Sequence, residues 1–508
     1  MPAGLRRWLL TTTIGSMSLP ASPITLVLSV DRSSPTPLHQ QVYDGYRRAI
    51  LRGDLQPGQK VPSSRELASE IRVSRFPVLH AYAQLLAEGY FESHVGSGTF
   101  ISATLPEQVM PSDPHADELE VRLSGRRPVA RRTVLYPVFE RDLHLRGWGA
   151  FGVHQPAFDQ FPFQVWSSLV ARHSRNPHAN AIHNIDPLGS KRFREEICAY
   201  LRTARAVKCD PAQIMVVSGS QQALDITARV LLNAGDSVLV EEPGYGLERT
   251  VLATAGCRLK LVPVDHEGMD VAYGTRRFPG AKAAFVTPSH HYPLGSTMGA
   301  TRRLLLLNWA QSTGAWIVED DYDSEYRFDA RPIASLQGLD VNSRVIYIGT
   351  FSKILFPSLR IGYIVIPPDL VKHFTAVRFA MDIFPPYLYQ EVLTDFMADG
   401  HFGRHIRKMR QLYGARRATL IDCLQAEFGE QIELHGTAAG MHVTVTLREG
   451  LDDHEIATRA AHERLWLLPL SPCYARKKQR CGFVLGFGST AAEHIPAAVK
   501  RMRSFIPG

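Results

Sequence analysis

One short stretch of the sequence places a reactive amine directly after an apolar run. Residues 350–363, TFSKILFPSLRIGY, hold Lys353, with Arg360 seven positions further along the chain. A lysine amine held in an apolar pocket near another positive group loses its proton and attacks an aldehyde, as Schiff-base lysines do. Most lysines lie in exposed loops instead, so the stretch alone leaves both interpretations open.

Two other stretches would complement such a lysine. In AWIVEDDYDSEYRF, Asp320, Asp321 and Tyr322 end an apolar run. A carboxylate there is costly unless it meets a cation, such as a protonated pyridine nitrogen, although a helix cap or a salt bridge would also satisfy it. In IMVVSGSQQALD, the residues from Ser218 to Gln221 join a strand to a helix. Small residues at a helix N-terminus leave N–H groups free for a phosphate, yet many such turns bind nothing.

These stretches belong to an alternating pattern of strands and helices. From about residue 141, the strand-like runs are QIMVVSG, SVLVEEP, AAFVTP, AWIVEDD and RVIYIGT, with helical segments such as SQQALDITARVLLNAG between some of them. This alternation predicts an α/β domain with a largely parallel sheet. Ligands in such sheets bind beyond the carboxyl ends of the strands, so we expect Lys353, Asp320 and the turn at Ser218 to meet there. A smaller α+β portion is expected at the C-terminus.

Residues 36–102 predict a separate unit of three helices and a hairpin. The first helix ends at Gly53 and carries one apolar stripe, formed by Val42, Tyr46, Ala49 and Ile50. Ser63 followed by Glu66 predicts a capping box that starts the second helix. Ser74 is expected to cap the third helix, whose apolar stripe is formed by Val78, Tyr82, Leu85 and Leu86. YFESHVGSGTFIS predicts the hairpin.

Such a unit has the arrangement of a winged helix-turn-helix, whose second helix enters the major groove N-terminus first. The residues expected to contact DNA lie at two helix starts and on the wing: Ser64, Arg65, Ser74, Arg75, Gly96, Ser97 and Gly98. Arginine suits both phosphate and guanine, and backbone amides at helix starts suit phosphate. Charge does not decide the matter, because residues 31–103 contain eight Lys/Arg and seven Asp/Glu. A small helical domain with surface arginines therefore stays an alternative.

Residues 61–102, VPSSRELASEIRVSRFPVLHAYAQLLAEGYFESHVGSGTFIS, resemble the reader domain of GntR-family transcription regulators, with Phe76 and Pro77 where polar residues are usual. Residues 141–508 resemble the fold-type I aminotransferase framework through VVSGSQQALD, EEPGYG, EDDYDSEYRF and GTFSKILFPSLRIGY. The two modules in this order resemble the MocR subfamily. The resemblance implies a winged helix-turn-helix DNA-binding domain at 31–103, a linker at 104–140 and an aminotransferase-like effector domain at 141–508, which binds pyridoxal 5'-phosphate (PLP).

The resemblance also implies a role for each site residue. Lys353 would form the internal aldimine with PLP, Asp320 would pair with the pyridine nitrogen, and Tyr322 would reach the ring hydroxyl. Tyr245 would stack on the ring. The phosphate would be held by Gly219, Ser220, Gln221, Thr350, Ser352 and Arg360. No metal is expected.

Several positions depart from the aminotransferase pattern. Tyr292 in SHHYPLG stands where those enzymes usually carry asparagine, and Asn184 where they tend to carry a tyrosine donated by the partner subunit. The arginine that normally binds a substrate carboxylate in a bidentate fork would fall at Gly482. Arg480 and Lys478 are close in sequence but would need a shifted register.

The function that the resemblance implies is a PLP-dependent, DNA-binding transcriptional regulator that senses PLP or an amine or amino-acid effector through the internal aldimine. It would act as a homodimer on double-stranded operator DNA. The alternative is an active PLP-dependent aminotransferase with a vestigial DNA-binding module, so residual transaminase activity is left open.

The composition is compatible with either function. A chain of 508 residues exceeds what one core usually supports, and a formal charge of +8 permits a nucleic-acid partner without requiring one. The six cysteines form no CxxC pair, which favours reduced thiols in the cytoplasm. No apolar run approaches the roughly 18 residues of a membrane span, so no membrane partner is expected. The first 22 residues only faintly imitate a signal peptide.

Overall fold

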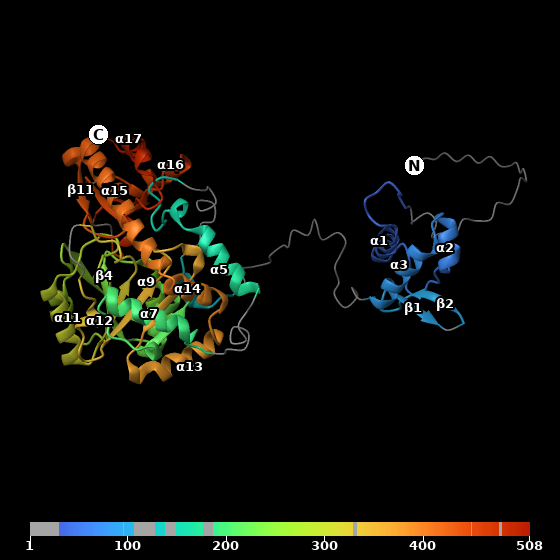
Figure 1. Cartoon of the computed structure of the whole chain (residues 1–508), viewed down its shortest axis with the longest axis horizontal. Helices are drawn as coiled ribbons and strands as arrows, with labels where there is room; N and C mark the ends of the chain where they lie inside the picture. Colours follow the sequence, from blue (N-terminus) through green and yellow to red (C-terminus); the bar gives the residue numbers. More distant parts are fainter. Residues whose placement is uncertain are drawn as a thin grey trace, which may run out of the picture. The chain divides into compact units, whose positions relative to one another are not determined.

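The computed structural model describes residues 30–94, 96–105, 128–137, 149–175, 186–328, 333–448, 450–476 and 480–507. The chain divides into two compact units, Met1–Pro128 and Val129–Gly508 (Figure 1). Asn184, Lys478 and residues 1–29 lie outside the described parts, as does most of the expected linker.

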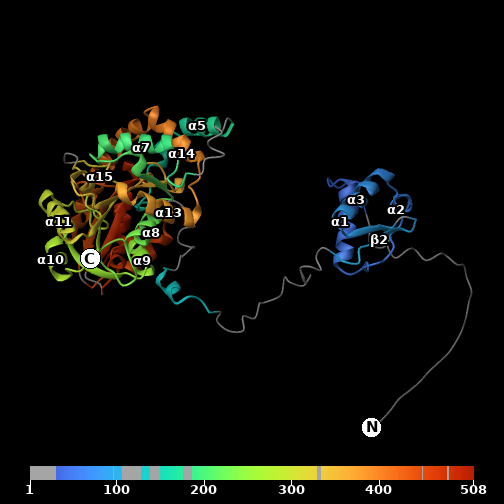
Figure 2. The ribbon, with the colours of Figure 1, turned by 90° about the horizontal axis from the view of Figure 1, so that it is seen from below.

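The N-terminal unit consists of three helices and a hairpin (Figure 2). Its elements are α1 (Leu38–Leu51), α2 (Ser64–Glu70), α3 (Arg75–Ala87), β1 (Phe91–His94) and β2 (Gly98–Ile101). The two strands pair antiparallel, with Phe91 opposite Ile101 and His94 opposite Gly98. Short helices of this kind are stable mainly because their apolar faces pack together.

The apolar stripe predicted for the first helix is buried, and the capping box is present. The Ser63 amide donates to Glu66 Oε2 at 2.8 Å, and Ser63 Oγ accepts from the Glu66 amide at 3.3 Å. Ser74 is the N-cap residue of α3, although its side chain makes no capping bond. The prediction was wrong for Leu86, which is 37% exposed, because it faces a groove between α3 and the wing.

The second unit is built on an eight-stranded sheet with the order β3-β10-β9-β8-β7-β4-β5-β6. The bounds of these strands are β3 (Ile214–Val217), β4 (Ser237–Glu242), β5 (Arg258–Asp265), β6 (Gly268–Met269), β7 (Ala283–Val286), β8 (Trp316–Asp321), β9 (Val345–Thr350) and β10 (Gly362–Val365). All five strands that the sequence predicted are present, and the α/β fold class is confirmed.

The sheet is parallel from β5 to β9, and β10 is antiparallel to both of its neighbours, β3 and β9. The sequence analysis did not predict β10, because its four residues follow the Lys353 loop directly. Because β10 is antiparallel to both β3 and β9, these two strands run in the same direction and end at the same edge of the sheet. This edge is where Lys353 and the turn at Ser218 were expected to meet.

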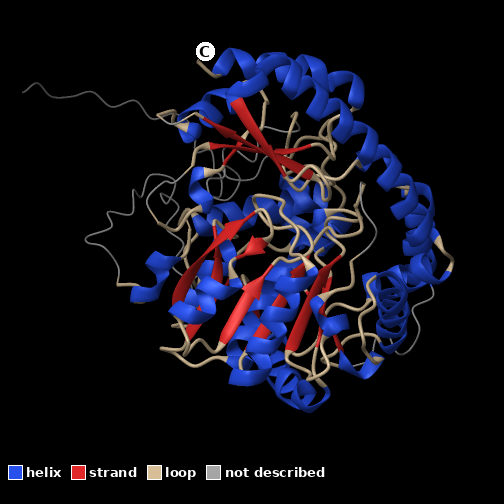
Figure 3. Ribbon diagram, turned by 90° about the vertical axis from the view of Figure 1, so that its left-hand side faces the viewer, coloured by secondary structure: helices blue, strands red, loops and turns tan. Residues whose placement is uncertain are grey.

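Helices cover both faces of the large sheet (Figure 3). They are α5 (Phe163–Arg175), α7 (Lys191–Ala204), α8 (Ser220–Leu231), α9 (Gly246–Thr254), α10 (Val271–Arg277), α11 (Ala300–Thr313), α12 (Leu336–Leu339), α13 (Val371–Asp382) and α14 (Leu388–Ala398). Alternate residues of a strand face opposite sides. Accordingly, Ile214 and Val216 share one core with α7 and α14, whereas Met215 and Val217 share another with α8.

The C-terminal part forms the expected smaller α+β portion, with its own four-stranded antiparallel sheet of order β11-β12-β14-β13. Its elements are α15 (His401–Phe428), β11 (Ile432–His435), β12 (His442–Leu447), α16 (Asp453–His462), β13 (Leu468–Pro469), β14 (Gly482–Gly486) and α17 (Ile495–Phe505). Within the parts of the chain that the structure describes, none of the helices has the length and apolar character needed to cross a membrane.

Candidate cofactor site and DNA-binding surface

The turn after β3 and the loop after β9 lie side by side at the carboxyl edge of the sheet. Arg360 Nη2 donates to the backbone oxygen of Ser218 at 2.9 Å. Gly219 follows with a positive φ of 82°, a conformation that favours glycine. Ser220 is the first residue of α8. The structure thus brings Arg360 to the start of a helix whose N–H groups and dipole favour an anion.

Unpartnered polar atoms surround this helix start. Among the described residues, the buried Ser352 Oγ and Gln221 Oε1 have no hydrogen-bond partner. Thr350 Oγ1 accepts from the Ser352 amide at 3.2 Å, which fixes the beginning of the lysine loop. Buried polar atoms are normally satisfied, so these groups fit a phosphate that supplies the missing partner.

The two adjacent aspartates at the end of β8 have different partners. Asp321 Oδ2 accepts from Arg205 Nε at 2.8 Å and from the Tyr347 hydroxyl at 2.5 Å. Asp320 is also buried, but its Oδ1 has no hydrogen-bond partner in the described structure. Burial, and then the charge of Asp321, raise the pKa of Asp320 to about 7. The salt bridge with Arg205 therefore stabilises the charged Asp321 carboxylate. The Asp320 carboxylate has no such bond among the residues that the structure describes, so a bound cation would stabilise its charged form.

Lys353 is half-buried, just beyond the end of β9. Burial lowers the pKa of its amine to about 8, although the negative charges of Asp323 and Asp320 oppose the change. Arg360 adds to the lowering. Roughly a tenth of the amine is therefore neutral and nucleophilic at pH 7, far more than for an ordinary lysine.

Three tyrosines, Tyr245, Tyr292 and Tyr322, pack in one cluster. The Tyr322 hydroxyl is 3.2 Å from His290 Nδ1. The rings of Tyr245 and Tyr292 meet edge to face, with centroids 5.9 Å apart. Tyr245 is the N-cap residue of α9, which places its half-buried ring at the edge of the sheet where Asp320 lies.

The structure provides no carboxylate-binding arginine at position 482. A Cβ on Gly482 would lie 2.0 Å from the backbone oxygen of Val445, so no side chain fits there. Arg480, the neighbour in sequence, is exposed. The two other positions named in the sequence analysis, Asn184 and Lys478, lie outside the described residues.

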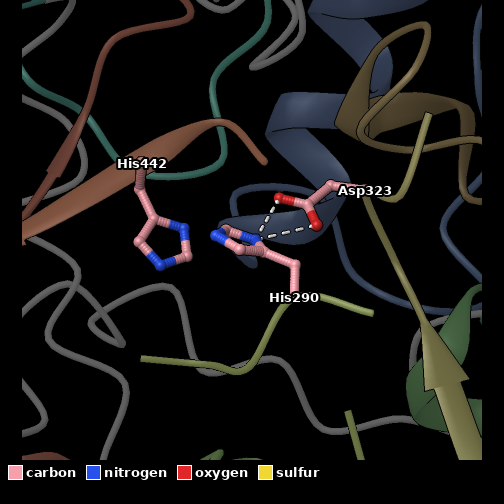
Figure 4. A group of neighbouring side chains, drawn as sticks. All are labelled: His290, Asp323 and His442. Carbon is pink, nitrogen blue, oxygen red and sulfur yellow. Dashed lines mark hydrogen bonds and ion pairs between the residues drawn. The ribbon is translucent and has the colours of Figure 1, made fainter. Parts of the chain in front are cut away.

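A cluster of three buried residues beside Tyr322 was not predicted: His290, Asp323 and His442 (Figure 4). His290 Nδ1 is 3.0 Å from both Asp323 oxygens, and His442 Nε2 is 3.0 Å from the Pro293 oxygen. Asp323 also accepts from the Met441 amide at 3.1 Å. The cluster has residue types that bind metals, yet its described hydrogen bonds instead connect the loops after β7 and β8 to the C-terminal sheet. His290 and Asp323 lie within the quoted stretches SHHYPLG and EDDYDSEYRF, whereas nothing in the sequence singled out His442.

In the N-terminal unit, several of the residues expected to contact DNA lie close together, at the starts of α2 and α3 and on the wing. Arg75 Nε donates to Ser64 Oγ at 3.1 Å, which joins the starts of α2 and α3. Arg65, Ser74 and Arg75 are exposed. The hairpin tip is formed by Gly96, Ser97 and Gly98, which are exposed as well. These three tip residues and Ser64 line the groove beside α3.

Comparisons with known proteins agree with both units. Residues 38–101 match the family "Bacterial regulatory proteins, gntR family", and residues 151–484 match "Aminotransferase class I and II". The chain is 37% identical to the probable rhizopine catabolism regulatory protein MocR of Rhizobium meliloti, over 94% of this chain and 95% of that protein. It is 30% identical to the HTH-type transcriptional regulator TauR of Rhodobacter capsulatus, over 96% of this chain and 99% of that one.

Solved structures show the same fold for the second unit. The crystal structure of Pyrococcus horikoshii kynurenine aminotransferase, in complex with PMP, matches with a TM-score of 0.69 and 27% identity, over 74% of this chain and 96% of that chain. The two family matches occur in one chain and in this order, and the relatives named as regulators align along nearly its whole length. The chain is therefore a transcriptional regulator that belongs to the MocR subfamily of the GntR family, with a winged helix-turn-helix domain followed by a fold-type I aminotransferase-like domain.

Proposed function

We propose that this regulator holds PLP at the carboxyl edge of its large sheet and changes its binding to operator DNA when PLP or an amine effector occupies that site. The observation that carries the proposal is the convergence of Lys353, the unpartnered carboxylate Asp320, and the Gly219 turn with Arg360. When bound, PLP supplies an aldehyde that condenses reversibly with primary amines.

Each of the chain's own residues has a task in this proposal. The helix start at Ser220, the unpartnered Ser352 hydroxyl and Arg360 bind the phosphate. Asp320 holds a proton on the pyridine nitrogen, which removes the cost of its own burial. Lys353 supplies the neutral amine for covalent attachment. Tyr322 orients the ring hydroxyl, and Tyr245 packs on the ring and keeps water away.

On the DNA side, we propose that the residues expected from the sequence contact the duplex. The N-terminal end of α3 enters the major groove with Arg75, while Ser64, Arg65 and Ser74 bind phosphates at the two helix starts. The wing tip approaches the backbone through Gly96, Ser97 and Gly98. A regulator of this kind acts in the cytoplasm, where the chromosome and the PLP pool are accessible.

We further propose that the chain acts as a homodimer through the second unit. Large apolar side chains are exposed on α5 and around α13 and α14: Phe163, Phe379, Ile383, Phe384, Leu388 and Tyr389. Exposed apolar side chains that gather in one region often mark interaction surfaces. A dimer also suits a reader that recognises two half-sites. We expect Phe379→Glu to shift the sedimenting species from dimer to monomer.

The test of the cofactor site uses the full chain reconstituted with PLP. The wild type is expected to show a visible absorption band that survives gel filtration, and Lys353→Ala is expected to lose it. Lys372→Ala, which removes an exposed lysine on α13, serves as the control and should keep the band. A colourless wild type after reconstitution would remove the cofactor from the proposal and leave DNA binding intact.

The alternative, an active aminotransferase, is favoured by the structural similarity to kynurenine aminotransferase. Gly482 argues against it for ordinary α-amino acids, because the position of the carboxylate-binding arginine has no room for a side chain. Mixing the PLP form with a panel of amino donors and a keto acid decides between them. Turnover at enzymatic rates, typically 1 per second or faster, would establish the enzyme, and a spectral change without turnover supports the sensor.

A further inference from the structure

The recognition helix α3 presents a large apolar side chain to solvent in its first turn. Phe76 is the second residue of α3 and is 76% exposed. Leu79, three residues further along, is 43% exposed. Residues three apart lie on the same face of a helix, so the two side chains form one apolar strip at the N-terminal end of α3.

This strip lies among the expected DNA contacts. Arg75 precedes Phe76 and is held to Ser64 by the 3.1 Å bond between Nε and Oγ. Leu79 lines the groove between α3 and the wing, together with Ser64, Gly96 and Gly98. Pro77 is the third helical residue of α3, where its missing N–H costs no hydrogen bond. The apolar strip therefore belongs to the surface that we propose above to face the major groove.

Single exposed apolar residues are common and need no explanation. Two exposed apolar residues on one face, at the helix end proposed to enter DNA, do need an explanation, because the groups they would contact there are the edges of bases. The only apolar group that bases display in the major groove is the 5-methyl group of thymine, and phenylalanine is among the side chains that contact it. The groove side of α3 thus offers apolar surface where the DNA offers a methyl.

We propose that Phe76, with Leu79 beside it, reads the 5-methyl group of thymine in each operator half-site. The inference rests on the DNA-binding role proposed above for α3. It makes Phe76 a residue that determines specificity, since cytosine lacks the methyl group and is disfavoured at the same position. Arg75 would then supply the polar contacts of the half-site, and Phe76 its apolar one.

The test removes the methyl group alone. The full-length protein selects its preferred duplex from random-sequence DNA, and each thymine of that duplex is then replaced singly by deoxyuridine. We expect at least one thymine in each half-site at which the substitution weakens wild-type binding about fourfold, the value of one buried methyl-sized group. Phe76→Ala should bind the thymine duplex more weakly and show no further loss with deoxyuridine at that position.

Two variants serve as comparisons. Leu79→Ala tests the second half of the strip, and Val341→Ala removes an 81% exposed apolar side chain from the other unit and should behave as the wild type. The inference is overturned if every deoxyuridine duplex binds within 1.5-fold of the thymine duplex, or if Phe76→Ala keeps the full sensitivity. If the selection returns no preferred sequence at all, the reader assignment of α3 fails, and this inference fails with it.

Discussion

A Cβ atom placed on Gly219 would lie 2.9 Å from Nη2 of Arg360. The turn before α8 and the lysine loop thus approach each other so closely that only glycine leaves the guanidinium in position. The positive φ of Gly219 adds a second reason for glycine. Substitution at this position should therefore affect both the backbone and the expected phosphate site.

The first prediction separates these two effects with a matched pair. Gly219→Ala and Gly235→Ala both place a side chain at a positive φ, 82° and 92°, but nothing lies within 4 Å of a Cβ on Gly235. Each is expected to lower the free energy of unfolding, by about 1 to 3 kcal/mol. Only Gly219→Ala should also weaken PLP binding, by tenfold or more, in an equilibrium titration. Equal PLP affinities for the two variants would contradict the phosphate assignment.

The second prediction concerns the pH dependence of cofactor uptake. The pKa of Lys353 is lowered to about 8 from its ordinary value of 10.5, and only the neutral amine attacks an aldehyde. The rate of PLP uptake by the apo-protein should rise about tenfold per pH unit up to pH 8 and then level off. Stopped-flow absorbance measures it. A rate that keeps rising to pH 10 would mean that the lysine is not perturbed.

The third prediction concerns Asp320, whose pKa is raised from 3.8 to about 7. Between pH 3.8 and about pH 7, the Asp320 carboxyl group is protonated in the folded apo-protein and ionised in the unfolded chain. The contribution of Asp320 to stability therefore falls as the pH rises from 3.8 to about 7. Asp320→Asn should stabilise the apo-protein at pH 7, on the order of 3 kcal/mol, and the gain should vanish near pH 4. The same variant should bind PLP more weakly.

Denaturant unfolding at several pH values, beside a PLP titration, checks this prediction. A variant that is more stable but binds PLP more weakly indicates that the carboxylate serves the ligand and does not stabilise the fold. A variant that is less stable than the wild type at pH 7 would assign Asp320 to the fold.

The fourth prediction concerns Arg75. Its side chain is exposed and positioned by Ser64, so Arg75→Ala should lower the affinity for the protein's own upstream DNA by about 1–3 kcal/mol. Arg52→Ala removes an exposed charge at the end of α1 and should cost little. Fluorescence anisotropy at fixed salt measures both, because such affinities depend strongly on ionic strength. Equal losses would point to general charge rather than a specific contact.

Much of the site could be predicted from sequence, since a parallel strand fixes where the next residue lies. Lys353, Asp320 and Gly219 each follow an apolar run directly, and the carboxyl ends of such strands share one edge. That reasoning did not separate Asp320 from Asp321. The difference depends on Arg205, 116 positions away in sequence, and no local pattern carries that information.

Two other features needed the folded chain for a similar reason. The strand β10 has only four residues, too few for a periodicity of its own, and is defined by its pairing with β3 and β9. The bond network of His290 and Asp323 reaches the C-terminal sheet through Met441, 118 positions from Asp323. The helical spacing of Leu86 predicted a buried side chain, but the wing does not cover it.

The position of β10 also has a consequence for how the protein is made. β10 joins the strand before the Gly219 turn to the strand before Lys353, so the site cannot close until residue 365 has left the ribosome. The reader unit, by contrast, is complete by residue 105, about 260 residues earlier. At roughly 5–20 residues per second, each nascent chain spends about 13 to 50 seconds with a folded DNA reader and no place to hold a cofactor.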